Sequence, residues 1–217
     1  MLNKVLEDEQ YPLPLIKDVL TQRQGYDWVT VIDLTSQFYH FKLSEESTYL
    51  CVITTPFGLY RYLRLPMGVK IAPAFAQAIM ESLFRHDFDD VSCFINDIAV
   101  FTTGFFELHV ERVQATLRVL VQAGFSIKPK KCFWGVKEVE YLGHIITTDG
   151  IKPQAKKINA ILKLQAPSTP KQLRSFIGMV NYYRDFIRQR SHILTPLTAQ
   201  TKYKKKNHMV SGMPRFI

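Results

Sequence analysis

The chain has 217 residues, of which 47% are hydrophobic, so it is long and apolar enough for one large or two modest domains, which excludes a disordered protein. No apolar run reaches the ~20 residues of a membrane span, and the start of the chain lacks the apolar centre of a signal peptide. The three cysteines have neither the spacing of a zinc site nor that of a disulfide framework. We therefore expect an intracellular protein, cytoplasmic or nuclear and not secreted. The net charge of +9 is unevenly distributed: residues 152–217 hold fourteen Lys and Arg and one acid, whereas residues 1–151 hold fourteen Lys and Arg and eighteen acids. The basic segment indicates a polyanionic partner, with nucleic acid the first choice and a membrane surface the second. The alternative is a solvated helix face with a charged tail.

The N-terminal part predicts a short helix and then a strand that ends in a carboxylate. Residues 15–24 are expected to form the helix, which Gly25 ends because glycine readily adopts positive φ. Residues 28–33 alternate in the way that predicts a strand. Asp33 is therefore expected at a strand end, where it is held rigidly and can still reach solvent.

The next segment predicts a strand pair, a loop and a helix. Strands over residues 48–54 and 59–63 are expected on either side of a turn that contains Pro56 and Gly58. A loop over residues 65–73 follows. Its last residue, Pro73, can open a helix over residues 74–88.

Residues 91–101 predict a hairpin, because two short apolar runs flank Asn96 and Asp97. Both side chains tolerate the left-handed backbone of a tight turn, so Asp97 is expected at the tip. Taken alone, such a pair is usually only a turn. Together with Asp33 at the end of another strand, however, it provides carboxylates that could share metal ions.

Residues 106–123 predict an amphipathic helix that ends before Gly124. Its expected apolar face consists of Phe106, Val110, Val113, Leu117 and Leu120. His109 lies beside this face without a partner at ligand spacing, so it is expected to be a core or surface histidine and not a metal ligand.

The remainder predicts short strands, then basic helices beyond a subdomain boundary near residue 150. The expected strands cover residues 125–127, 139–142 and 145–147. The expected helical segments cover residues 153–164, 170–178 and 182–187. Ser168 or Thr169 is expected to cap the second of them.

The order and spacing of several motifs make nearly the whole chain resemble the reverse transcriptases of gypsy-like long-terminal-repeat retrotransposons, and more distantly those of retroviruses. The motifs are Tyr11-Pro12-Leu13-Pro14, Asp33-Leu34, Leu65-Pro66-Met67-Gly68, Ala72-Pro73-Ala74-Phe75-Ala76-Gln77, Phe94-Ile95-Asn96-Asp97, Tyr141-Leu142-Gly143-His144 and residues 173–187.

The resemblance implies an α+β polymerase with a palm, partial fingers and a helical thumb or connection. It implies a palm over residues 28–47 and 81–148, fingers over 48–80, and a thumb and connection over 150–200. In domain terms, residues 1–150 are the reverse transcriptase palm with partial fingers and 151–200 the basic thumb or connection. Residues 201–217 stay unassigned.

The resemblance also implies RNA-directed DNA synthesis by two-metal nucleotidyl transfer. Two Mg²⁺ (or Mn²⁺) ions about 3.5–4 Å apart stabilise the charge that forms when a primer 3′-hydroxyl attacks a deoxynucleoside triphosphate. Asp33, the backbone carbonyl of Leu34 and the hairpin residues Asn96 and Asp97 are the expected catalytic and metal-binding groups, because magnesium prefers oxygen ligands.

Four further residues are implied to contact the nucleotide. Phe38 matches the aromatic residue that packs against the sugar and excludes a 2′-hydroxyl, although on its own it would be taken for a core aromatic. Met67 and Gly68 match the loop that lines the incoming nucleotide. Gln37 stands beside the sugar, where the family prefers glycine or alanine.

Departures from the family pattern predict an impaired enzyme. The family has two adjacent aspartates at the hairpin, and here the first of them is Asn96. From the resemblance we also expect the chain to begin within the fingers and to lack a ribonuclease H domain. The resemblance implies a template-primer of RNA and DNA as partner, and we expect a second polymerase chain or a separate ribonuclease H domain to supply the missing parts.

The alternative is a non-catalytic nucleic-acid-binding or scaffold protein with the same fold. A third reading is a decayed coding sequence whose product does not fold stably.

Overall fold

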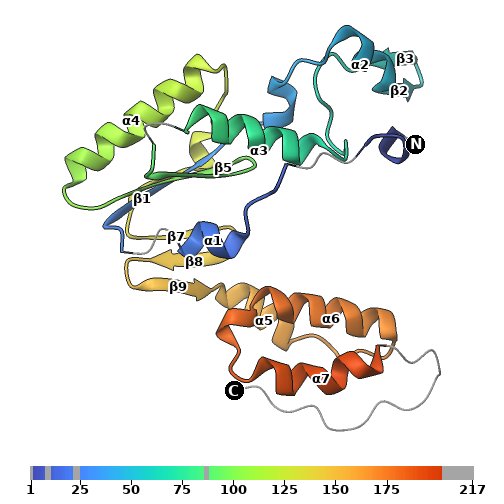
Figure 1. Cartoon of the computed structure of the whole chain (residues 1–217), viewed down its shortest axis with the longest axis vertical. Coiled ribbons are helices and arrows are strands. Elements are labelled where there is room, and N and C mark those ends of the chain that lie inside the picture. The colour runs from blue at the N-terminus through green and yellow to red at the C-terminus, as the bar shows by residue number, and fades with distance from the viewer. Residues whose placement is uncertain (1, 8–10, 22–24, 86–87, 202–217) are drawn as a thin grey trace. The chain divides into compact units, whose positions relative to one another are not determined.

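A computed structural model gives the fold, and it describes residues 2–7, 11–21, 25–85 and 88–201 (Figure 1). The chain mixes helices and strands in an α+β arrangement. It divides into two compact units, Met1–Lys152 and Pro153–Ile217. The boundary between them lies close to the one expected near residue 150. In the part of the chain that the structure describes, no helix is both long enough and apolar enough to cross a membrane.

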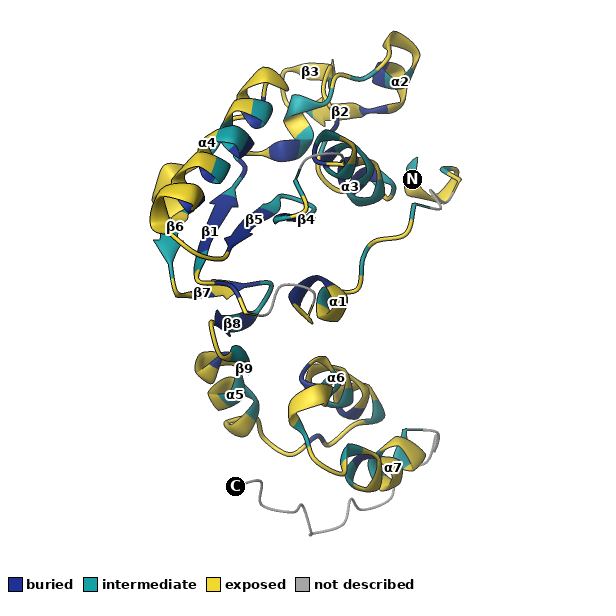
Figure 2. Ribbon diagram, turned by 60° about the vertical axis from the view of Figure 1, so that its left-hand side comes forward, coloured by how far each residue is buried: buried dark blue, intermediate teal, exposed yellow. Residues whose placement is uncertain are grey.

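The first unit is built around an antiparallel sheet with the strand order β4-β5-β1-β6. Its strands are β1 (Trp28–Asp33), β4 (Val91–Phe94), β5 (Asp97–Thr102) and β6 (Phe133–Val136). The strand predicted over residues 28–33 is confirmed, and it pairs with β5 along its whole length. Figure 2 shows that β1 and β5 are largely buried.

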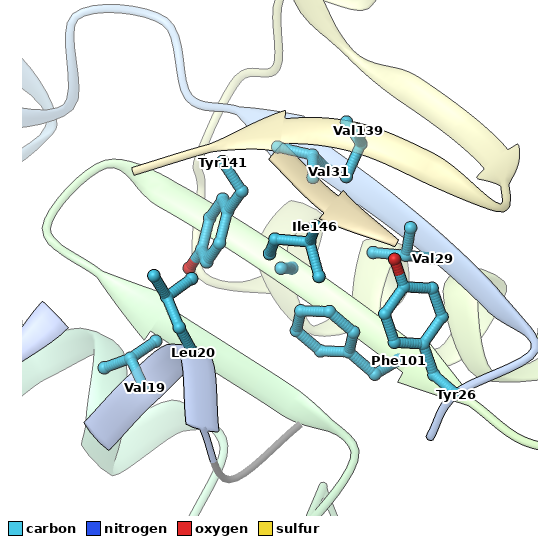
Figure 3. Close-up of a cluster of buried hydrophobic side chains, with 10 residues drawn as sticks. Val19, Leu20, Tyr26, Val29, Val31, Phe101, Val139, Tyr141 and Ile146 are labelled. Carbon is cyan, nitrogen blue, oxygen red and sulfur yellow. The ribbon is translucent and has the colours of Figure 1, made fainter. Parts of the chain in front are cut away.

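Successive residues of β1 and β5 point to opposite faces of the sheet and enter two different apolar clusters. On one face, Ile32 and Ile98 pack with side chains of α3 (Ala72–Leu83) and α4 (Phe106–Gln122). On the other face, Val31 and Phe101 pack with side chains of α1 (Ile16–Thr21), β7 (Glu138–Tyr141) and β8 (His144–Thr147) (Figure 3). Because both faces are covered, the strand ends are held rigidly.

The remaining elements of this unit are short. Strands β2 (Val52–Thr55) and β3 (Gly58–Arg61) form a hairpin, and β9 (Gly150–Pro153) joins β7 and β8 in a second sheet. One helix, α2, spans Glu45–Leu50. The single 3₁₀ turns are η1 (Leu2–Lys4), η2 (Gln37–His40) and η3 (Pro129–Lys131).

Several predicted boundaries in the first unit are wrong. The strand expected over 48–54 begins only at Val52, because Ser44 caps a helix by accepting a hydrogen bond from the Ser47 amide at 3.3 Å. Helix α3 ends at Leu83 and not at Phe88, and residues 86–87 lie outside the described residues. The short helix α1 is described over Ile16–Thr21, and the end expected for it at residues 22–24 lies outside the described part.

Around β6, one strand prediction is wrong and one strand was missed. Residues 125–127 contribute only an isolated bridge between Ile127 and Leu34. Strand β6 was not expected, because Gly135 interrupts its apolar run. Gly135 has φ +54 and its amide donates to Thr30 Oγ1 at 2.9 Å, where the pairing of β6 with β1 is irregular.

The buried face of α4 differs in part from the expected one. Val113 and Leu120 are buried as predicted, but Val110 is 37% exposed and His109 is 1% exposed. The two ring nitrogens of His109 lie 2.7 Å from the hydroxyls of Thr30 and Thr102. His109 is therefore a core histidine.

The second unit is helical through its described residues, which end at Thr201; residues 202–217 of the expected tail lie outside them. Its elements are α5 (Ala155–Leu162), α6 (Pro170–Tyr182), η4 (Arg184–Phe186) and α7 (Arg190–Gln200). Thr169 caps α6 as predicted, in a capping box with Gln172. Helix α6 runs beyond the expected residue 178 to Tyr182, so the helix expected over 182–187 is replaced by the end of α6 and by η4. Helix α7 was not expected.

Candidate active site

Asp33 and Asp97 lie directly opposite each other on neighbouring strands. Asp33 ends β1, Asp97 begins β5, and the two residues are partners in the antiparallel register. Opposite residues of such a pair have Cα atoms about 4.5–5.5 Å apart and side chains on the same face. The structure thus brings together the two carboxylates that the sequence had singled out.

The surroundings of Asp97 disfavour its negative charge. The pKa of Asp97 is raised, first because burial penalises its charged form and second because Asp33 is close; Lys131 opposes both effects. The ammonium group of Lys131 lies 3.4 Å from Asp33 Oδ2. Sequence reasoning missed Lys131, because η3 delivers it from 98 residues further along the chain.

The hairpin tip consists of Ile95 and Asn96, with Phe94 and Asp97 paired on either side. Asp97 is therefore one residue past the tip where it was expected. The residue in the left-handed region is Ile95, with φ +53, and not Asn96 or Asp97. A positive φ at the first position of a two-residue turn normally selects glycine, and it is unfavourable for a β-branched residue.

Asn96 joins the two strand ends. Its backbone oxygen accepts from the Leu34 amide at 3.3 Å. Its side-chain Nδ2 donates to Asp97 Oδ1 at 3.4 Å. The amide is thus a hydrogen-bond donor to the carboxylate beside it, whereas an aspartate in its place would repel that carboxylate.

Two buried glutamines hold the backbone of Ile95. Gln77 Oε1 accepts from the Ile95 amide at 2.7 Å, and its Nε2 donates to Cys93 O at 2.9 Å and to Glu81 Oε1 at 2.7 Å. Gln37 Nε2 donates to Ile95 O at 2.9 Å. The sequence contains Gln77 within one of the quoted motifs, but nothing in its local pattern identified this contact.

The other expected nucleotide-binding residues lie on two further segments. Leu34 is buried directly after Asp33, and Phe38 is half-buried in η2. Met67 is 62% exposed in a separate turn with Gly68, whose φ is +89. This turn is tied to Asn3, which donates to Gly68 O at 2.8 Å.

The donor atoms at the strand ends fit a divalent cation. The carboxylates of Asp33 and Asp97 and the backbone oxygen of Leu34 are hard oxygen donors, of the kind that Mg²⁺ and Mn²⁺ prefer, whereas Asn96 turns its Nδ2 toward Asp97. The raised pKa of Asp97 reflects burial first and the nearby charge of Asp33 second, and a bound cation would counter both effects. Among the described residues, no group of three or more His, Cys, Asp or Glu gathers at one point.

The second unit carries a strong positive charge. Between Pro153 and Thr201, eight Lys and Arg stand against Asp185 alone. All eight except Arg190 are exposed. A surface of this kind attracts phosphates.

Comparison with known proteins gives a consistent result. Residues 1–146 match the family model described as reverse transcriptase (RNA-dependent DNA polymerase). The chain is 34% identical over 206 residues to the retrovirus-related Pol polyprotein from transposon 297 of Drosophila melanogaster, covering 94% of this chain and 19% of that protein. It is 32% identical to the transposon Tf2-3 polyprotein of Schizosaccharomyces pombe, covering 90% and 15%. This chain therefore spans about a fifth or less of these relatives.

Solved structures resemble the fold as well. A foamy viral protease-reverse transcriptase in complex with an RNA/DNA hybrid has a TM-score of 0.86 at 24% identity, covering 97% of this chain and 29% of the other. The same kind of protein in complex with double-stranded DNA has a TM-score of 0.89 at 24% identity, covering 97% and 37%.

Proposed function

Because the chain belongs to the reverse transcriptase family of RNA-dependent DNA polymerases, as found in retrotransposon Pol polyproteins, we propose that it carries the centre for RNA-directed DNA synthesis inside the cell. The observation that supports this most directly is the placement of Asp33 opposite Asp97 at adjoining strand ends. The family normally uses divalent metal ions. Here Asp33, Asp97 and the backbone oxygen of Leu34 would hold Mg²⁺ or Mn²⁺.

The bound cation would stabilise the negative charge that builds up when a primer 3′-hydroxyl attacks a deoxynucleoside triphosphate. The carboxylates of Asp33 and Asp97 would hold this cation in a fixed position, because β1 and β5 are buried on both faces. Asn96 brings no negative charge to the site, so we propose that synthesis is impaired in this chain. Phe38, Met67 and Gly68, with Gln37 behind them, would line the nucleotide.

We propose that residues 1–150 act as palm with partial fingers and residues 151–200 as a thumb or connection that holds the template-primer. The support for the second part is its excess of exposed cations. The foamy viral protein of similar fold binds an RNA/DNA hybrid in one structure and double-stranded DNA in another. A second polymerase chain or a ribonuclease H domain would complete the assembly.

The second candidate is a protein that binds nucleic acid without catalysis. Two observations favour it. Asn96 replaces a charged ligand, and Lys131 already neutralises Asp33 at 3.4 Å. Such a protein would keep the fold and the basic second unit and would act as a scaffold.

Primer extension separates the two candidates. The purified chain is incubated with a primed RNA template, deoxynucleoside triphosphates and a series of Mg²⁺ or Mn²⁺ concentrations, beside its Asp33→Asn variant. Weak, metal-dependent extension that Asp33→Asn abolishes is the expected result. Binding of the primed template by both proteins, with no extension by either at any metal concentration, would instead identify the scaffold.

A further inference from the structure

Ile95 holds a backbone conformation that its own side chain opposes. A φ of +53 places it in the left-handed region, which β-branched residues avoid because Cβ crowds the following carbonyl. Such a residue persists only where its surroundings hold it in place. The question is therefore which groups hold the turn.

Gln37 is one of these groups, and its orientation is fixed. The side chain is buried, with 3% of the residue exposed, and Nε2 donates to Ile95 O at 2.9 Å. Its Oε1 is buried and has no hydrogen-bond partner in the described part of the chain. Turning the amide over would place Oε1 against the carbonyl oxygen of Ile95 and would lose the bond, so only the observed orientation satisfies the turn.

Gln37 also ties the turn to the segment that carries Asp33. The Leu34 amide donates to Asn96 O at 3.3 Å, and Gln37 Nε2 binds the preceding carbonyl, Ile95 O. Two consecutive carbonyls of the turn are thus bound by residues that follow Asp33 closely in sequence. On the opposite side, the Ile95 amide donates to Gln77 in α3.

We propose that Gln37 is a positioning residue that locks the strained hairpin turn onto the end of β1 and so keeps Asp97 opposite Asp33. It acts through the backbone of Ile95 and touches neither carboxylate. The inference rests on the proposed function only in naming these carboxylates as the site. The conformational lock itself is a property of the free protein.

A Gln37→Met variant tests the lock. Methionine fills a similar volume, and it removes the donor to Ile95 O together with the unpartnered Oε1, so the effect on global stability is small. The turn, in contrast, loses one of its two side-chain holds. The expected result is hydrogen exchange about tenfold faster at the amides of Ile95, Asn96 and Asp97, which is the effect of losing ~1.4 kcal/mol of local stability. Amides in the middle of β1 and β5 should exchange at the original rate.

The matched control is Gln154→Met in the second unit, where Gln154 is 5% exposed and its Nε2 also lacks a partner within the described residues. It should leave exchange at the hairpin unchanged. A Mn²⁺ titration of the same proteins should show several-fold weaker binding for Gln37→Met and no change for Gln154→Met. Neither measurement needs polymerase activity, so an inactive protein with a locked turn would overturn the proposed function and keep this inference.

A second pair of variants tests whether Gln37 acts by stabilising the strained backbone conformation of Ile95. In an Ile95→Gly background the left-handed conformation is freely accessible, so adding Gln37→Met should accelerate exchange by less than about threefold in this double-mutant cycle. If Gln37→Met does not fold, Gln37→Leu, which also has no donor, replaces it. Unchanged exchange at the turn, equal acceleration throughout the sheet, or the same tenfold effect in both backgrounds would each overturn the proposal.

Discussion

A single side-chain atom at position 96 sets the charge of the candidate metal site. We predict that Asn96→Asp raises the rate of primer extension by roughly two to four powers of ten, because a carboxylate ligand is worth several kcal/mol and ~1.4 kcal/mol corresponds to tenfold. The same change removes the 3.4 Å hydrogen bond to Asp97 and adds repulsion, so the metal-free protein should unfold at lower temperature. Extension assays across Mg²⁺ concentrations and thermal unfolding with and without Mg²⁺ measure both effects. Equal, substantial activity in the two proteins would mean that Asn96 is a sufficient ligand.

Lys131 is a second residue that affects the net charge of the candidate metal site. Its ammonium group pairs with Asp33 at 3.4 Å while its side chain is 57% exposed. We predict that Lys131→Gln tightens Mg²⁺ or Mn²⁺ binding by up to about fivefold, because exposed ion pairs contribute at most ~1 kcal/mol. Lys130→Gln, on the same turn, is the matched control and should have a smaller effect. An unchanged or weaker metal affinity for Lys131→Gln, measured by titration, would contradict the prediction.

At the scale of elements, His109 joins α4 to the central sheet. It lies between Thr30 of β1 and Thr102 of β5, both at 2.7 Å. Its pKa is lowered, chiefly by burial and against the opposing effect of Asp90. Below the ordinary histidine pKa of about 6.5, the unfolded chain therefore binds a proton that the folded protein rejects.

We predict that the free energy of unfolding falls as the pH is lowered below about 6.5 and stops falling below the folded pKa of His109, with a slope of at most ~1.4 kcal/mol per pH unit from this group. Urea unfolding at several pH values measures the slope. His109→Gln, which retains a donor and an acceptor but does not titrate, should flatten it. His192→Gln, an exposed histidine in α7, should not. A slope that His109→Gln leaves unchanged would assign the pH dependence to other groups.

Elements with regular local patterns were predictable, and those that depend on a single special residue were not. The alternation of residues 28–33 and the helical spacing of 106–123 gave β1 and α4 nearly to the residue. In contrast, residues 48–50 have the composition of a strand but belong to helix α2, because Ser44 caps the N-terminus of this helix. Strand β6 was not predicted, because Gly135, which lies in a bulge with φ +54, interrupts its apolar run.

The candidate site shows the same division. The proximity of Asp33 and Asp97 followed from two strand ends and the order of motifs. The contacts of Gln77 and Lys131 join positions 18 and 98 residues apart, and no local periodicity encodes them. The left-handed Ile95 could not be foreseen either, because its conformation is imposed by partners from elsewhere in the chain and opposed by its own side chain.

At the scale of the whole molecule, charge is divided between the two units. The unit Pro153–Ile217 carries thirteen Lys and Arg and a single acid, Asp185, whereas acids outnumber bases before it. We therefore expect nucleic acid to bind mainly through phosphate contacts of the second unit, with little sequence preference. The affinity should fall steeply with salt, with a log-log slope of about −0.9 for each phosphate contact on a duplex.

Neutralising three exposed cations of the second unit tests this division. We predict that Lys156→Gln, Lys157→Gln and Arg174→Gln together, in the full chain, reduce the magnitude of the salt slope by up to about 2.7, because each phosphate contact contributes ~0.9. The matched control changes Lys4, Arg118 and Lys137 of the first unit to glutamine, which alters net charge equally but not the phosphate contacts. Titrations of a labelled primed duplex between low and physiological salt give both slopes. Equal slopes for the two triple variants would mean that only net charge matters, and binding that is independent of salt would remove the second unit as the phosphate-binding surface.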